Sequence, residues 1–243
     1  MDIPSSLAIV ALAALIHASF QLSVSVLTLL SGHAIGSKRS HGKLLHLSGS
    51  FVFGAGLMSL LLLSFTSLVF SNLFGGNTPP LVWAMACGLA AGVAVSIWLF
   101  YYRKGQGTTL WIPRSVAEYL TSRTKATKQG AEAFGLGLSS ITGEVLFIIA
   151  PLTIAALTLA SLSPGWQLVG LGLYAVISMS SLVIVWMMIG GGVSLGRIQK
   201  WRESNKHFLQ FAAGTGLLVL ALFVYVTEVV ETVVSGVYYG FGG

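Results

Sequence analysis

Residues 133–162 read AFGLGLSSITGEVLFIIAPLTIAALTLASL, and Glu144 is the only charged side chain among them. A helix that crosses a bilayer needs roughly 20 mostly apolar residues, so this segment predicts a transmembrane helix. At about 1.5 Å per residue, Glu144 lies about 18 Å into the span, near the middle of the hydrocarbon. A carboxylate at that depth costs about 3 kcal/mol on insertion scales. Glu144 therefore needs a partner, a cavity or a proton.

The rest of the chain has the same apolar character. Apolar residues make up 55% of the sequence and charged residues only 8%, whereas a soluble domain carries about 25% charged residues. The mean hydropathy is +0.86. Charged residues are absent from four long stretches, 3–37, 44–102, 145–196 and 207–227. These features predict an all-α integral membrane protein, and residues 3–30 are interpreted as its first span rather than as a cleaved leader.

We expect six transmembrane helices in a single membrane domain that covers residues 1–243. The six spans are placed at 6–30, 45–70, 80–102, 133–162, 166–189 and 207–230. Residues 1–102 form a first half of three helices and residues 133–243 a second half. The connection at 103–132 joins the two halves.

Basic residues set the expected orientation. All thirteen Lys and Arg residues fall in the first, third and fifth connections, at 31–43, 103–132 and 190–206. The positive-inside rule places these connections in the cytoplasm, so both termini lie outside a cytoplasmic (inner) membrane. The same rule explains the net charge of +6 without a nucleic-acid partner. Within the third connection, residues 112–125 predict a short helix that either lies on the anionic leaflet or serves as an ordinary linker.

A weak internal repeat relates the two halves. At an offset of 121 to 123 residues, four positions of span two match span five: Gly49, Met58, Ser59 and Leu61 align with Gly170, Met179, Ser180 and Leu182. At the same offset, Gln21 of span one falls opposite Glu144 of span four. Because the two halves start on opposite sides of the membrane, the sequence predicts two inverted three-helix repeats, a plan that recurs in secondary transporters.

Glu144 stands among residues that predict an interrupted helix. Thr142 and Gly143 precede it, and Pro151 follows. Pro151 has no N–H to donate to the carbonyl of Phe147, so we expect the helix to kink or break near residues 145–147. A helix broken at midplane exposes backbone groups that bind ions. Glu144 is interpreted as a residue that carries a coupling proton or binds a cation. The alternative is a protonated carboxyl that only holds the bundle together.

Span one supplies the other candidate site residues. His17, Gln21 and Thr28 lie on one helical stripe, since steps of four and seven residues stay on one face. Polar side chains inside a membrane face the bundle interior, so Gln21 is expected to meet Glu144. The stripe serves either as solute ligands or as packing contacts.

Other residues of interest favour structural roles. The histidines at 33, 41, 46 and 207 have neither the spacing nor the acidic and Cys neighbours of a metal site, so no metal and no cofactor is expected. Protease, hydrolase and nucleotide-binding motifs are absent, which argues against an enzyme. A seam of small residues in span three indicates close helix packing, either within the bundle or in a homodimer. The seam consists of Ala84, Gly88, Gly92 and Ser96.

Six spans, two inverted halves and polar segments in spans one and four resemble the LysE-type transporter superfamily, which includes small exporters and the CcdA/DsbD electron carriers. The redox branch carries a reactive Cys in each of these two spans, about where Gln21 and Glu144 stand here. The resemblance therefore implies export rather than electron transfer.

The expected function is a small secondary transporter of an ion or small solute, working by alternating access around a midplane site. Glu144 would carry the coupling proton or bind a cation, with Gln21, His17, Thr28 and Thr142 near the solute. Membrane lipids and the solute are the expected partners. The alternatives are a non-transporting membrane subunit or assembly factor, and a lipid- or quinone-handling protein.

Overall fold

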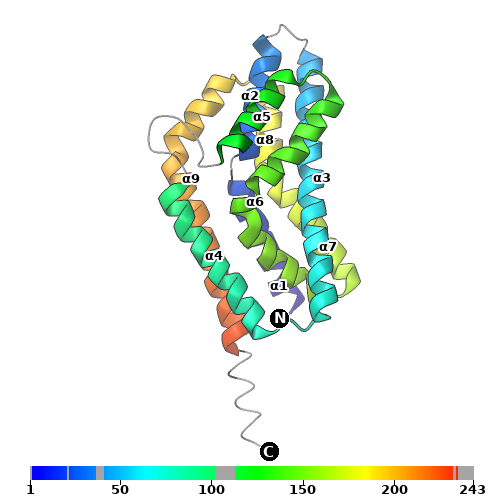
Figure 1. Cartoon of the computed structure of the whole chain (residues 1–243), viewed down its shortest axis with the longest axis vertical. Helices are drawn as coiled ribbons and strands as arrows, with labels where there is room; N and C mark the ends of the chain where they lie inside the picture. Colours follow the sequence, from blue (N-terminus) through cyan, green and yellow to red (C-terminus); the bar gives the residue numbers. More distant parts are fainter. Residues whose placement is uncertain (1, 21, 37–40, 102–112, 232–233, 235–243) are drawn as a thin grey trace, which may run out of the picture.

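A computed structural model of the chain describes residues 2–20, 22–36, 41–101, 113–231 and 234. The described residues are almost entirely helical, and none of them forms a strand (Figure 1). The prediction of an all-α membrane protein is confirmed at this level. The helices are α1 Ile3–Ser19, α2 Leu22–Gly36, α3 His41–Phe74, α4 Pro80–Phe100, α5 Arg114–Ala126, α6 Gly130–Ala160, α7 Pro164–Ser178, α8 Ser180–Gly190 and α9 Leu195–Val224, followed by a π-helix, η1, at Tyr225–Val230.

Four uninterrupted helical segments are long and apolar enough to cross a membrane. They are α3, α4, α6 and the continuous segment formed by α9 and η1. Two further spans would each consist of a bent pair of helices. The α1–α2 pair bends by 42° and the α7–α8 pair by 45°. The described chain therefore provides four to six membrane crossings.

Of the kink or break predicted near residues 145–147, the break is wrong and the kink stays a prediction. Helix α6 runs without interruption through Gly143 and Pro151. Its apolar window is 67% buried, far more than that of any other single-helix span, so neighbouring helices support the backbone where Pro151 removes one hydrogen bond. The chain instead leaves the helical path at Phe20, whose backbone is extended, and interrupts its helix again at Met179.

Two of the expected connections contain helix. The predicted short helix in the third connection is confirmed as α5, and Leu120 on its apolar face is buried. This helix packs on α2 and α6, so protein covers its apolar face. Helix α9 begins at Leu195, twelve residues before the predicted span, so the basic residues placed in the fifth connection lie mostly on a helix.

The elements have a consistent arrangement along the long axis. Helix α5 and the beginning of α9 lie at one end of the bundle, whereas the beginning of α1 and η1 lie at the opposite end (Figure 1). Two described segments that carry basic residues, α5 and the beginning of α9, therefore lie at the end away from the start of the chain.

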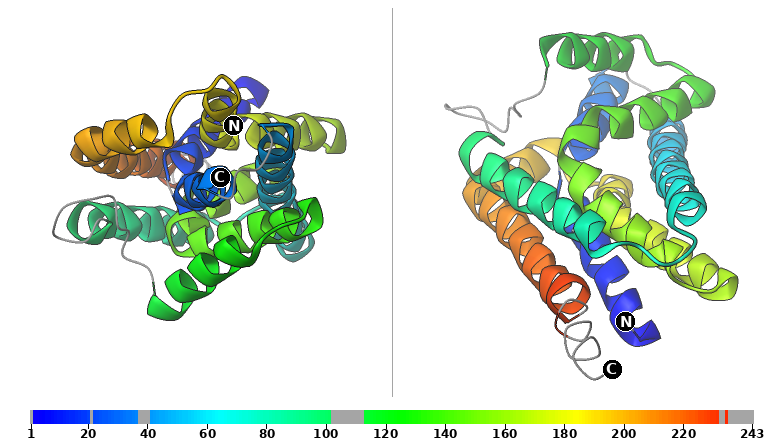
Figure 2. Two further views of the ribbon diagram at one scale, coloured as in Figure 1. Left: turned by 90° about the horizontal axis from the view of Figure 1, so that it is seen from above. Right: turned by 60° about the horizontal axis from the view of Figure 1, so that its bottom comes forward.

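Helix α6 is the central element of the bundle (Figure 2). Its closest partner is α3, and glycines make that approach possible. A Cβ atom on Gly137 would overlap the carbonyl oxygen of Phe51, and one on Gly54 would overlap the carbonyl oxygen of Phe134. Small residues on both helices bring the two backbones into direct contact, as is common between membrane helices.

Several helix pairs in the first half of the chain correspond to pairs in the second half, and we call this correspondence the exchange pattern. Helix α6 packs on α3 and α4, while α1 packs on α7 and α9, and α1 and α6 pack on each other. Helices α4 and α9 also form a pair, where Trp98 stacks on Phe211 and Gly214 leaves room for the Trp98 ring. Exchanging the first half of the chain for the second leaves this set of pairings unchanged.

The small-residue seam of α4 does not face the bundle. Gly88, Gly92 and Ser96 are exposed, and a Cβ on either glycine would meet nothing within 4 Å. The buried face of α4 carries Ala90 and Ala94 instead. Packing of the seam within the bundle is therefore wrong, and its use in a homodimer stays a prediction.

The contact between α3 and α6 gives a testable contrast between two glycines. Gly137→Ala places a methyl group against the α3 backbone, so we expect the free energy of unfolding to fall by about 1–3 kcal/mol. Gly88→Ala adds the same methyl group in open space and should leave stability unchanged or raise it by up to about 1 kcal/mol. Reversible unfolding in mixed micelles measures both, and equal effects would contradict this packing.

Candidate functional site

The buried carboxylate of Glu144 meets the break between α1 and α2. The backbone N–H of Ser23 donates a hydrogen bond of 2.7 Å to Glu144 Oε1, and Glu144 is only 2% exposed. Ser23 lies in the first turn of α2, where N–H groups lack partners within the helix. A carboxylate satisfies such a group and is favoured by the positive end of the helix dipole. Glu144 therefore caps α2 from another helix.

A second hydrogen bond ties Ser23 to α6. Ser140, one turn before Glu144, lies 3.1 Å from Ser23 between their hydroxyl oxygens, and it donates to the carbonyl of Gly137 over 2.8 Å. With the Ser140 proton so used, the Ser23 hydroxyl donates to Ser140. Both the backbone and the side chain of Ser23 are thus held by α6.

A buried His–Tyr pair lies near both bends. His17 Nδ1 and the Tyr174 hydroxyl are 2.9 Å apart, and both side chains are buried. His17 stands in the last turn of α1, where its carbonyl accepts from the N–H of Phe20. Tyr174 stands near the end of α7, shortly before the bend at Met179. This hydrogen bond joins the two bent pairs just before each of them changes direction.

Arg202 is a site residue that the sequence reasoning missed. Its side chain is 3% exposed, and its Nη2 donates to the Ser25 hydroxyl on α2 over 2.7 Å. The residue had been assigned to a cytoplasmic connection because of its charge. Ile198, four residues earlier, is also buried, and this spacing on one helical face is the signal that indicates a helix rather than a loop.

The other predicted site residues have separate outcomes. Gln21 lies outside the described residues. Thr28 is buried, but its hydroxyl donates to the Ser25 carbonyl of its own helix over 2.8 Å. Thr142 is exposed and donates to the Leu138 carbonyl, so its placement beside Glu144 in a shared site is wrong. The structure thus brings Glu144 to span one, but at Ser23 in the described part of that span.

The described residues contain no group of three or more His, Cys, Asp or Glu side chains placed to hold a metal ion. Cys87 is buried in α4 as a free thiol. The histidines at 33 and 41 have side chains outside the described set. The chemistry of the site therefore comes from Glu144, the serines of α2 and α6, the His17–Tyr174 pair and Arg202.

No protein-family model, no curated protein and no solved structure matches this chain.

Capping of α2 by Glu144 predicts different effects for two substitutions. Glu144→Ala leaves the Ser23 N–H unsatisfied in an apolar interior, so unfolding should become easier by about 1–3 kcal/mol. Glu144→Gln keeps a carbonyl oxygen for that N–H and should lose less than half as much. Unfolding in mixed micelles gives both values, and amide hydrogen exchange across 23–26 should speed up mainly in the alanine variant. Equal losses would contradict the capping role.

Burial of Arg202 predicts a difference between two arginines of α9. Arg202→Gln removes the charged donor to Ser25, and we expect a loss of about 1–3 kcal/mol in the free energy of unfolding. Arg197 is exposed on the same helix, so Arg197→Gln should change stability by no more than about 0.5 kcal/mol. Similar effects in the two variants would show that Arg202 is solvated.

Proposed function

We propose that this chain is a small secondary transporter that exports an ion or small solute and is coupled to proton movement at Glu144. The observation that carries the proposal is the hydrogen bond from the Ser23 N–H to the buried Glu144 carboxylate, 2.7 Å long, at the break in span one. A charge at this depth is costly and marks a functional position in membrane proteins. Here the charge lies at the first turn of α2, where N–H groups lack partners within their own helix.

Within this proposal, the bundle has six spans in two inverted halves. Glu144 and Ser23 are 121 residues apart, which falls within the repeat offset of 121 to 123 residues, and equivalent residues near a pseudo-twofold axis come into contact. The exchange pattern of helix pairings supports the same relation. In secondary transporters of this plan the site lies between the halves at midplane, which is where spans one and four meet.

The coupling chemistry follows from the two protonation states of Glu144. The ionised carboxylate accepts from Ser23 and interacts favourably with the positive end of α2. Protonation removes that charge, which weakens the hold on α2 because hydrogen bonds to charged groups are stronger than those to neutral ones. A solute or cation that binds the ionised carboxylate in place of the Ser23 N–H competes with α2 for Glu144. Occupancy of Glu144 thereby controls where the first turn of α2 lies.

The remaining polar groups have defined parts in this scheme. His17 lies in the last turn before the break, and His17 and Gln21 are proposed to contact the solute. Thr28 lies further along α2. The extended backbone at Phe20 leaves a hinge between α1 and α2. Helix α5 and the beginning of α9, which carry Lys and Arg, lie at one end of the bundle, and we assign that end to the cytoplasm of an inner membrane, with the termini outside. We also propose that the chain belongs to the LysE-type transporter superfamily, because six spans, two inverted halves and polar segments in spans one and four resemble that plan.

One observation favours the alternative of a non-transporting membrane subunit. The outward face of α4 presents Gly88 and Gly92 with open space beside them. Such a face suits a second helix, whether from another protein or from a second copy through Ala84, Gly88, Gly92 and Ser96. This alternative gives no role to the charge of Glu144, and the flux experiment separates the two.

Proton movement in proteoliposomes tests the proposed function. Purified protein is reconstituted with a pH-sensitive dye inside, and sodium, potassium, magnesium, manganese and zinc salts and the common amino acids are added one at a time. We expect at least one of them to drive proton movement through the wild-type protein. Glu144→Gln should reduce that movement at least tenfold, because the amide cannot carry the proton.

Glu118→Gln is the matched control, since Glu118 is an exposed carboxylate on α5, and it should retain full flux. Retained flux in Glu144→Gln, with the protein folded, would exclude the coupling role. If the wild-type protein moves protons with none of these compounds, the transporter proposal is wrong and the subunit alternative is favoured.

A further inference from the structure

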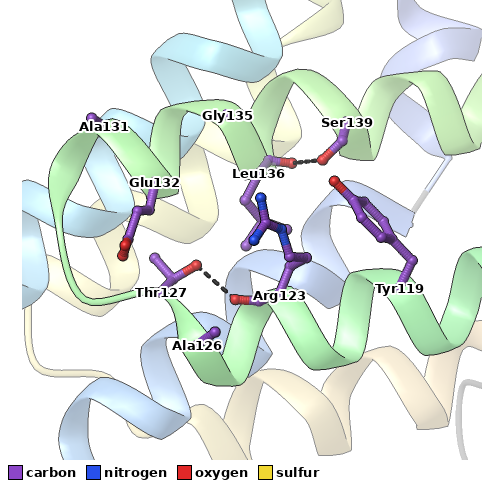
Figure 3. Close-up of a pocket in the computed structure, with 9 residues that line it drawn as sticks. All are labelled: Tyr119, Arg123, Ala126, Thr127, Ala131, Glu132, Gly135, Leu136 and Ser139. Atoms are coloured by element: carbon purple, nitrogen blue, oxygen red, sulfur yellow. Dashed lines mark hydrogen bonds between the residues drawn. The ribbon is translucent and has the colours of Figure 1, made fainter.

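A polar hollow of about 340 Å³ lies between α5 and the first turns of α6, apart from the Glu144 site (Figure 3). Tyr119 and Arg123 line it from α5, while Glu132, Gly135 and Ser139 line it from α6. Helix α6, which is long and apolar enough to cross a membrane, begins at Gly130. The hollow therefore lies at the end of a membrane span, at the depth where lipid headgroups are found.

Arg123 presents a positive charge to this hollow. Its guanidinium lies 5.9 Å from the centre of the Tyr119 ring and points from α5 into the gap toward α6 (Figure 3). Among the described residues the guanidinium makes no hydrogen bond or ion pair. Its planar set of donors matches a phosphate group, which it can bind with two parallel hydrogen bonds.

Glu132 presents a negative charge to the same hollow. Its Oε2 atom accepts from the backbone N–H groups of Lys128 and Gln129, at 2.6 and 3.1 Å, and so forms part of the cap of α6. These bonds fix the carboxylate in place. Its other oxygen, Oε1, accepts no hydrogen bond from the described residues, and Glu132 lines the hollow.

An uncovered stripe of α6 continues from the hollow along the span. The members of the stripe follow steps of three and four residues and are exposed or half-buried: Ala131, Gly135, Ser139, Thr142, Leu146 and Ile149. A Cβ atom on Gly135 would meet nothing within 4 Å. The stripe changes from small and polar beside the hollow to apolar further on, which is the order of groups along a phospholipid.

We propose that the α5–α6 hollow binds the headgroup of a zwitterionic phospholipid that carries a primary ammonium, with one acyl chain along the α6 stripe. The phosphate contacts Arg123, and the ammonium donates to Glu132 Oε1. A purely anionic headgroup places no cation at Glu132. A choline headgroup has no N–H to donate, and Arg123 already covers the Tyr119 ring that a quaternary ammonium would prefer. The charges of the hollow therefore favour phosphatidylethanolamine.

Lipid retention measured by native mass spectrometry tests this site. The purified full chain is equilibrated with equal amounts of phosphatidylethanolamine, phosphatidylglycerol and phosphatidylcholine of the same acyl chains. Wild-type protein should retain phosphatidylethanolamine several-fold over the other two. Arg123→Gln should lower its retention about tenfold, because a charge-assisted bidentate contact is lost. Lys125→Gln removes the same charge two residues away, outside the hollow, and should change nothing.

Two further variants separate the headgroup from the acyl chain. Glu132→Gln keeps the side-chain oxygen that caps α6, so the protein should fold, but the preference for phosphatidylethanolamine over phosphatidylglycerol should disappear. Gly135→Leu fills the stripe at a position where a Cβ atom would meet nothing within 4 Å, and it should lower retention of all three lipids. No preference for phosphatidylethanolamine in the wild-type protein, or equal effects of Arg123→Gln and Lys125→Gln, would overturn the proposal.

Discussion

The hydrogen bond between the Ser23 N–H and the Glu144 carboxylate is the constraint on which the centre of this bundle depends. In hydrocarbon, a helix that stops leaves backbone N–H groups without water to satisfy them, and a carboxylate without donors is equally costly. The Ser23 N–H supplies the donor that the carboxylate needs, and the carboxylate supplies the acceptor that the N–H needs. The break between α1 and α2 and the carboxylate on α6 are therefore one feature of the structure, in which each group stabilises the other.

The rest of the packing brings these two groups together. Helix α6 approaches its neighbours closely because Gly137 and Gly54 have no side chains in the way, and Ser140 adds a second hydrogen bond to Ser23. On the α2 side, Arg202 of α9 donates to Ser25. The first two turns of α2 thus have an acid of α6 at Ser23 and a base of α9 at Ser25, in a chain that is only 8% charged.

The sequence predicts the helices of this protein but not where they break. Long apolar segments predict membrane helices because every helix that crosses a bilayer meets the same apolar lipid interior. The amphipathic spacing within residues 112–125 predicts α5. Glu144 was identified because an isolated charge stands out in an apolar run. A kink or break was predicted near residues 145–147, because Pro151 leaves the carbonyl of Phe147 without a donor, yet α6 is continuous there. The break at Phe20 has neither Gly nor Pro beside it, and partners distant in sequence stabilise it. Arg202 was missed for the same reason, since its burial depends on Ser25, 177 residues away.

The two interpretations of Glu144, as a structural cap and as a proton carrier, describe one hydrogen bond in two protonation states. The His17–Tyr174 contact holds α1 to α7 without involving Glu144, so α1 stays in place whichever state the carboxyl adopts. The extended residue Phe20 separates α1 from α2. In the proposed transporter, a proton on Glu144 then weakens the hold on α2 alone. A cap that α6 supplies to α2 makes the position of the first turn of α2 depend on a single proton, and the proposed alternating access requires a two-state element of this kind between the halves.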